Sequence, residues 1–364
     1  MKILGKMILY PALLFNAFLV GMLILCAYSE LIQPRAHPIA AALGLAFPFF
    51  LVANLLFLVF WLVVSYRYAL LPLAGLLICA PQIRAYVPFN PFGKTPPKES
   101  IKLLSYNVMS FSYNEKRNGK NPILSYLQES GADIICLQEY SVSGNKDKLT
   151  REDIRKALKD YPYSTIQESG QNGIHLACFS KFPILSTAPI HYQSTYNSSF
   201  CYTLKIGADT LMLVNNHLES NKLTMEERNM YEQMIDTPNA RTVKSRFPQL
   251  LRKLGEAASI RSAQIDSVSR VIEDSPYPTT IACGDFNAGP ISYAHHRLTR
   301  RLNDAFTRSG NGLGVSYNRN KFYFRIDNIL ISPNLKAYRC TVDRSIRASD
   351  HYPIWCYISK RTNS

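Results

Sequence analysis

Three observations in the sequence predict an α/β or α+β domain carried behind an N-terminal transmembrane helical segment. Residues 1–87 are rich in apolar runs of the length that crosses a bilayer. Residues 88–100 form a Pro-rich stretch without periodicity, which is typical of a linker. From Ile101 to Ser359, short strand-like runs alternate with helical patterns. We therefore expect a membrane region at 1–87, a linker at 88–100 and a folded domain at 101–364.

The membrane region contains two long apolar runs and a shorter one. Met7–Ala27 and Pro38–Val64 each reach the ~20 residues that span a bilayer. Ala69–Ile83 is interrupted by two prolines, so it predicts either a third span or a re-entrant segment. The first run could instead be a cleaved signal peptide, but no cleavage site follows it and a second span comes directly after. We expect two or three retained helices.

Flanking charges indicate the orientation of these helices. Lys2 and Lys6 favour a cytoplasmic N-terminus, and Arg67 favours a cytoplasmic second loop, whereas Arg35 in the first loop opposes this arrangement. Three spans would place the domain outside the cytoplasm, and two would leave it inside. We expect three, which makes the chain an integral protein of the inner or plasma membrane with its domain on the non-cytoplasmic side.

The elements of the domain follow from apolar runs bounded by turn-forming residues and from 3.6-residue spacing. The expected strands, in chain order, are Ile101–Val108, Ile134–Gln138, Ile174–Ser180, Ser199–Ile206, Thr210–Asn215, Thr280–Cys283, Asn328–Ser332 and Ile354–Ile358. The expected helices are Pro122–Ser130, Arg151–Asp160 and a long helical region within Lys222–Ile272. Such an alternation is long enough to bury a sizeable core.

Composition limits the partners and cofactors. Lys and Arg total 41 against 26 Asp and Glu, a net charge of +15 that favours anionic partners such as phosphate esters, nucleic acid or an acidic lipid surface. The eight cysteines show no Cys-x-x-Cys or regular spacing, so neither a zinc site nor a disulfide framework is predicted. No protein partner can be inferred.

The stretch Ile281–Pro290 predicts a buried strand that stops at a turn carrying Asp285 and Asn287. An Asp held at a strand end can polarise a nucleophilic water, and an Asn two residues later can hold an oxyanion without adding charge. Taken alone, the stretch is better explained as an Asx-type turn.

Other expected strands also end in polar residues of the same kinds. These residues are Asn107, Glu139, His217, Asp327, Asp350 and His351. Carboxylate and amide oxygens hold Mg²⁺, which grips a phosphate oxygen, and His donors offset the charge that develops on phosphorus. An Asp behind a His fixes its tautomer. The set predicts metal-assisted hydrolysis of a phosphate ester.

The motifs Ser-Tyr-Asn-Val, Leu-Gln-Glu-Tyr, Asn-Asn-His-Leu, Gly-Asp-Phe-Asn, Arg-Ile-Asp and Ser-Asp-His-Tyr-Pro-Ile occur in this order over residues 101–358. Their order resembles the endonuclease/exonuclease/phosphatase superfamily. The resemblance implies a four-layer sandwich of two packed mixed β-sheets flanked by helices, with the site at one end. The chain departs from the pattern at Ala288, where similar members often have a polar or acidic residue, and at Asn216, where many have Thr.

The resemblance also implies roles for individual residues. Glu139 matches the main ligand of a Mg²⁺ or Mn²⁺ ion, helped by Asn107 and, in some members, by Asp350. Asp285 matches the group that activates or orients the attacking water. Asn287 matches the amide that positions the phosphate.

Two histidines complete the implied site. His351 matches the residue that contacts the scissile phosphate, with Asp327 as its orienting partner, and His217 matches a second phosphate contact or leaving-group donor. Arg261 and Gln264 fall on one helical face and are expected to brace the site rather than to react. His295 and its neighbour His296 look like helix surface.

These patterns predict a membrane-anchored, Mg²⁺- or Mn²⁺-dependent phosphoester hydrolase whose substrate is nucleic acid, a phospholipid or a phosphosugar. The alternative is a catalytically silent, membrane-tethered binding or scaffold protein with the same fold. Two basic clusters, Arg241–Lys253 and Arg297–Arg325, are either solvated faces or a cationic surface that steers an anionic substrate.

Overall fold

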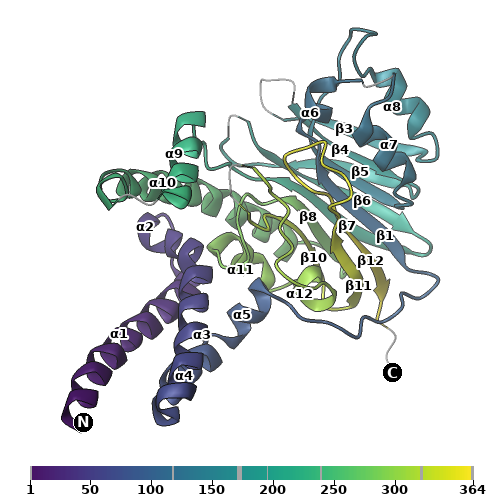
Figure 1. Cartoon of the computed structure of the whole chain (residues 1–364). Coiled ribbons are helices and arrows are strands. Elements are labelled where there is room, and N and C mark those ends of the chain that lie inside the picture. Colours follow the sequence, from purple (N-terminus) through teal and green to yellow (C-terminus); the bar gives the residue numbers. More distant parts are fainter. Residues whose placement is uncertain are drawn as a thin grey trace.

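Two six-stranded sheets pack face to face in the computed structural model, which describes residues 2–116, 119–169, 174–194, 196–237, 240–319 and 323–361 (Figure 1). The first sheet runs in the order β11 (Leu335–Val342), β12 (Ile354–Lys360), β1 (Ile101–Asn107), β2 (Ile134–Tyr140), β4 (Ile174–Ser180) and β3 (Tyr163–Ser169). The second runs in the order β5 (Ile184–Ile190), β6 (Ser198–Ile206), β7 (Asp209–His217), β8 (Thr280–Asp285), β10 (Asp327–Ile331) and β9 (Asn303–Asp304). Both sheets are mixed, because β1–β2 and β7–β8 are parallel and their other pairings are antiparallel.

Alternating apolar residues of the strands build three cores. Leu103 and Cys136 of the first sheet pack against Tyr202, Leu213 and Ile329 of the second in a fully buried cluster between the sheets. The outer face of the first sheet is covered by α7 (Pro122–Glu129) and α8 (Arg151–Ala157), and that of the second by α10 (Ala240–Glu273) and α11 (Tyr293–Thr299). This arrangement is the predicted four-layer sandwich, so the expected fold class is confirmed.

All eight expected strands are present, but four others were missed. The missed strands β3, β5, β9 and β11 are the four edges of the two sheets. An edge strand leaves one side unpaired and much of its surface wet, so it lacks the continuous apolar run of a central strand. β5 is largely exposed and carries Pro189. Proline has no N–H to donate to a neighbouring strand, and an edge strand tolerates this because one of its sides has no strand to bond. The expected long helical region is two helices, α9 (Met225–Asp236) and α10.

The N-terminal region consists of helices that extend away from the sandwich (Figure 1). It comprises α1 (Lys2–Tyr28), α2 (Pro38–Ala41), α3 (Phe47–Val64), α4 (Leu70–Ile78) and α5 (Ala80–Tyr86). Leu9–Leu31 and Pro38–Val64 are long and apolar enough to cross a membrane. Tyr66–Ile78 and Ala80–Tyr86 form a pair bent by 64°, which counts as a third candidate only if the pair is one broken span. Short elements complete the chain: α6 (Met109–Asn114) and α12 (Ala305–Ser309).

Buried polar side chains join α1 to α3 within this apolar region. Trp61 Nε1 donates to Asn16 Oδ1 at 2.9 Å, and Asn54 Nδ2 donates to the Leu19 carbonyl at 3.0 Å. Asn16 and Asn54 are fully buried. In apolar surroundings an amide without a partner is costly, so these bonds fix how the two helices face each other.

The loop between α1 and α3 packs closely on the sandwich. Gln33 Nε2 donates to Tyr293 Oη of α11 at 3.3 Å. A Cβ on Gly44 would lie 2.3 Å from the Ile291 carbonyl oxygen, so only glycine allows this backbone approach. Further along, Arg325 Nη2 donates to the Ala85 carbonyl of α5 at 2.6 Å. The helical region is therefore held against the sandwich through the loop between α1 and α3 and through its C-terminal end.

Replacing Asn16 with Leu removes the acceptor of the buried Trp61 N–H, and we expect the helical region to lose on the order of 1 kcal/mol of stability. Thermal unfolding of the full chain in detergent, with the exposed-site variant Leu14→Ile as control, measures the effect. A midpoint for Asn16→Leu that matches the control would show that the bond is dispensable.

Candidate active site

Three neighbouring strand ends of the second sheet place His217, Asp285 and Asp327 in a row. In the parallel β7–β8 ladder His217 pairs with Asp285, and in the antiparallel β8–β10 ladder Asp285 pairs with Asp327. Gly284, with φ +124°, lets the backbone pass Asn216, because a Cβ there would lie 2.0 Å from the Asn216 carbonyl oxygen. The central strands therefore determine the position of the site.

Asn107 connects this row to the first sheet. Its Nδ2 donates to Glu139 Oε1 at 3.0 Å and to Asp285 Oδ2 at 3.1 Å. Glu139 has a left-handed backbone, φ +52°, at the point where the β2–β4 register shifts between Leu137 and Tyr140. A bulge of this kind re-aims one side chain, and strained residues gather at functional sites.

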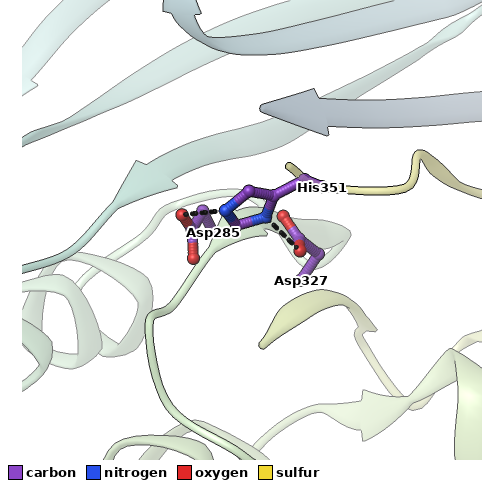
Figure 2. Close-up of side chains that lie close together, drawn as sticks. All are labelled: Asp285, Asp327 and His351. Atoms are coloured by element: carbon purple, nitrogen blue, oxygen red, sulfur yellow. Dashed lines mark hydrogen bonds and ion pairs between the residues drawn. The ribbon is translucent and has the colours of Figure 1, made fainter. Parts of the chain in front are cut away.

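His351 lies between two buried carboxylates (Figure 2). Its Nδ1 is 2.8 Å from Asp327 Oδ2, and its Nε2 is 3.6 Å from Asp285 Oδ2. Burial disfavours the charged imidazole, but Asp327 and Asp285 outweigh it and raise the pKa of His351 well above its usual value. Burial raises the pKa of Asp285, and the charge of His351 offsets part of that effect. The site thus favours an imidazolium held by two acids.

The remaining predicted site residues lie beside this group. His217 Nε2 is 3.5 Å from Glu139 Oε1 and 3.9 Å from Asp285 Oδ2. Asn287, also left-handed at φ +49°, donates its backbone N–H to Asp285 Oδ1 at 2.8 Å and its side-chain Nδ2 to the Leu218 carbonyl at 2.9 Å. These contacts join the turn after β8 to the end of β7.

The loop that carries Asp350 and His351 is attached to the end of β1. Ser349 Oγ donates to the Asn107 carbonyl at 2.8 Å and is 3.4 Å from Asp350 Oδ1. Asp350 is half-buried. Ser349 stands inside the Ser-Asp-His motif, so its position was visible in the sequence although no role was expected for it.

Residues outside the predicted set also support the site. Tyr317 packs its ring edge-on against His351, with centroids 5.1 Å apart, and no local pattern points to it. Gln138 Nε2 donates to Asn215 Oδ1 at 2.7 Å across the two sheets. The contacts of Tyr317 and Asn215 join residues that are far apart in the sequence, so no local sequence pattern reveals them.

Arg261 and Gln264 of α10 hold the segment after β7. Arg261 Nη1 donates to the Glu219 carbonyl at 2.8 Å, and Gln264 Oε1 accepts the Glu219 N–H at 2.8 Å. Burial lowers the pKa of Arg261 to about 10, with Asp285 and Glu219 opposing the shift, so the guanidinium stays charged at neutral pH. These contacts agree with the expected bracing role.

The two basic clusters are not one open cationic surface. Arg325 is buried, and its Nη1 is 2.8 Å from Asp304 Oδ2. His295, expected on the helix surface, is also buried, and its Nε2 lies 3.2 Å from the same oxygen, so that interpretation was wrong. Lys253 pairs with Glu227 at 2.6 Å. The side chains of Arg241 and Lys244 and the whole of Lys321 lie outside the described residues.

The donor set suits a hard cation. Asp285, Asp327 and His351 offer three atoms within 4.8 Å of one another. Mg²⁺ prefers oxygen ligands and keeps several of its waters. Glu139 is 30% exposed, whereas the carboxylates of Asp285 and Asp327 are buried, so Glu139 is the most accessible of these three acids.

The family model described as the endonuclease/exonuclease/phosphatase family matches residues 104–351. The chain belongs to the endonuclease/exonuclease/phosphatase family. A second model, described as a domain of unknown function, matches residues 6–86. No curated protein matches the chain.

Solved structures share the fold of this endonuclease/exonuclease/phosphatase family protein at low identity. The catalytic domain of human Nocturnin with bound sulfate is 15% identical with a TM-score of 0.52, and the match covers 73% of this chain and 97% of that one. An endonuclease/exonuclease/phosphatase from Beutenbergia cavernae is 13% identical with a TM-score of 0.50, covering 72% of each chain. At such identity these similarities establish the sandwich alone.

The pairing of His351 predicts a pH dependence of stability. Because the folded-state pKa of His351 is raised, its ion pairs stabilise the fold fully below the ordinary His pKa of ~6.5 and lose that effect as the pH rises through the raised value. Asp327→Asn should therefore lower the free energy of unfolding most near pH ~6.5, and less as the pH rises through the raised pKa of His351. Denaturant unfolding at several pH values measures the difference. A constant gap across the window would contradict a charged His351.

Proposed function

We propose that the chain is a membrane-anchored, divalent-metal-dependent phosphoester hydrolase in which water attacks phosphorus in line. The observation that carries the proposal is the convergence of Glu139, Asp285 and His351. Asn107 bonds both Glu139 and Asp285, and His351 Nε2 lies 3.6 Å from Asp285 Oδ2. Family membership supports the general reaction class. We further infer that residues 101–364 form the catalytic domain, behind a membrane region at 1–87 and a linker at 88–100.

Glu139, with Asn107 and Asp350, would hold Mg²⁺ or Mn²⁺. When bound, such an ion acts as a Lewis acid on a phosphate oxygen and orients the ester. Asp285 is the group that orients the attacking water and takes its proton, since its raised pKa brings a buried carboxylate closer to the pKa that a general base requires.

His351 donates to a phosphate oxygen on which negative charge accumulates. Asp327 holds the other ring nitrogen, so the imidazole keeps one orientation and its charge. His217 stands beside Glu139 and Asp285, where it can donate to a second phosphate oxygen or to the leaving group. Asn287 positions the phosphate by holding the turn after β8 against Leu218.

Asp285→Asn and Glu139→Gln should each lower metal-dependent hydrolysis by roughly 10²–10⁴-fold, because each removes a charge on which the reaction depends. Nucleic acid, phospholipid and phosphomonoester substrates are assayed with Mg²⁺ and with EDTA. The exposed-site variant Glu129→Gln, which keeps the same chemistry away from the site, should behave as the parent protein. Binding without turnover across the panel by a folded parent protein would favour the scaffold alternative.

We also infer three membrane crossings, with the catalytic domain outside the cytoplasm. The N-terminus with Lys2 and Lys6 lies at the far end of α1 from the sandwich, and α4 and α5 lead back to it (Figure 1). This path supports an odd number of crossings, with the bent pair as the third.

Protease added to right-side-out vesicles should digest the domain, whereas inside-out vesicles should protect it until lysis. Immunoblotting with an antibody against the domain follows the products, and a cytoplasmic marker protein reports vesicle integrity. The reverse pattern would place the domain in the cytoplasm and exclude three crossings.

A further inference from the structure

A cavity of about 530 Å³ lies between the membrane helices and the sandwich. On the membrane side it is lined by Phe49 and Phe50 of α3, and on the domain side by Leu250, Leu254 and Ala258 of α10. Its volume is within the ~300–1,000 Å³ typical of small-molecule sites. The lining is mostly apolar, so an apolar ligand fits it best.

One end of the cavity lies within the candidate membrane spans. Met22 lines the cavity. At a rise of 1.5 Å per helical residue, it lies roughly 13 Å along the helix from Leu31, the residue at which the first candidate span ends. Phe49 also lines it, belongs to the second span and is 70% exposed. A hydrocarbon chain could therefore enter from the bilayer without crossing water.

The other end of the cavity reaches the active site. Leu250, Leu254, Ala258 and Arg261 fall on one face of α10 at spacings of four, four and three, and all line the cavity. Arg261 holds the Glu219 carbonyl, two residues after His217. Asn287 lines the cavity as well and bonds Asp285 through its backbone N–H. The apolar face of α10 therefore ends at the charged Arg261, and the cavity there is also lined by Asn287 of the turn after β8.

Apolar side chains also pack in series from the cavity lining to the His351 imidazole. Ala42 of the membrane loop, Leu250 and Leu254 form one buried cluster, and Tyr317 packs against it. The Tyr317 ring also contacts the His351 ring, with centroids 5.1 Å apart. The cavity lining is therefore joined to the His351 imidazole by direct side-chain packing.

We propose that this cavity binds the hydrocarbon chain of a membrane lipid whose phosphate ester is hydrolysed at the site. The inference rests on the proposed function and names its substrate class. A nucleic acid or phosphosugar has no hydrocarbon chain for the cavity, whereas a lipid chain is stabilised by moving from water into an apolar lining. In the reaction the water oxygen bonds to phosphorus, the bond from phosphorus to the leaving oxygen breaks, and a proton from water ends on that oxygen.

Two matched substrates test the proposal with the full chain in detergent and Mg²⁺. Hexadecyl p-nitrophenyl phosphate and ethyl p-nitrophenyl phosphate share a leaving group and differ only in the chain. We expect kcat/KM for the hexadecyl ester to exceed that for the ethyl ester at least tenfold. Ala258→Phe, which fills the cavity, should reduce this ratio at least tenfold, whereas Ile260→Phe, two residues along α10 and exposed, should leave it unchanged.

A binding measurement separates this proposal from the proposed function. Hexadecyl phosphate with a diazirine at its chain end is photolysed with the full chain, and mass spectrometry locates the label. We expect labelling around Phe49, Phe50 or Leu250 that is lost in Ala258→Phe. Metal-dependent hydrolysis with an unchanged ratio and no label in the cavity would overturn the lipid site alone. Labelling in the cavity by a protein that hydrolyses no ester would overturn the hydrolase instead.

Discussion

The hydrogen bonds of Asn107 are the contacts on which the site depends. The interior between the two sheets is largely apolar, and Asn107 Nδ2 joins them near their ends by bonding Glu139 of one sheet and Asp285 of the other. Gln138 and Asn215 make a second such bond. Because a buried amide left without partners is costly, these bridges fix the spacing of the sheets where the catalytic groups meet.

Charge balance explains how so many acids share a dry site. Asp285 and Asp327 are almost completely buried, and each isolated carboxylate would be expensive to ionise there. His351 stands between them and carries the compensating charge. Asp327 Oδ1 has no hydrogen-bond partner within the described residues. Glu139 and Asn287 also have left-handed backbones, a strained conformation that persists because the surrounding sandwich holds it in place.

The helical region packs closely on the sandwich beside the candidate site. Glycine at position 44 and the bond from Arg325 to Ala85 hold the two regions together beside the turn that carries Asn287. Several basic residues are already paired with acids, as Arg325 is with Asp304. The net charge of +15 is therefore a weaker guide to the substrate than the shape and polarity of the space beside the site.

The sequence by itself determined the central strands, the order of the motifs and the family, because buried strands and the polar residues that end them are local patterns. It did not reveal the edge strands β3, β5, β9 and β11, whose exposed faces weaken the apolar signal. It placed His295 on the surface, since its buried partner Asp304 follows nine residues later on another element. Only the tertiary structure decided that Tyr317 meets His351 and that the N-terminal helices enclose a cavity with α10, because both depend on long-range packing that no local spacing encodes.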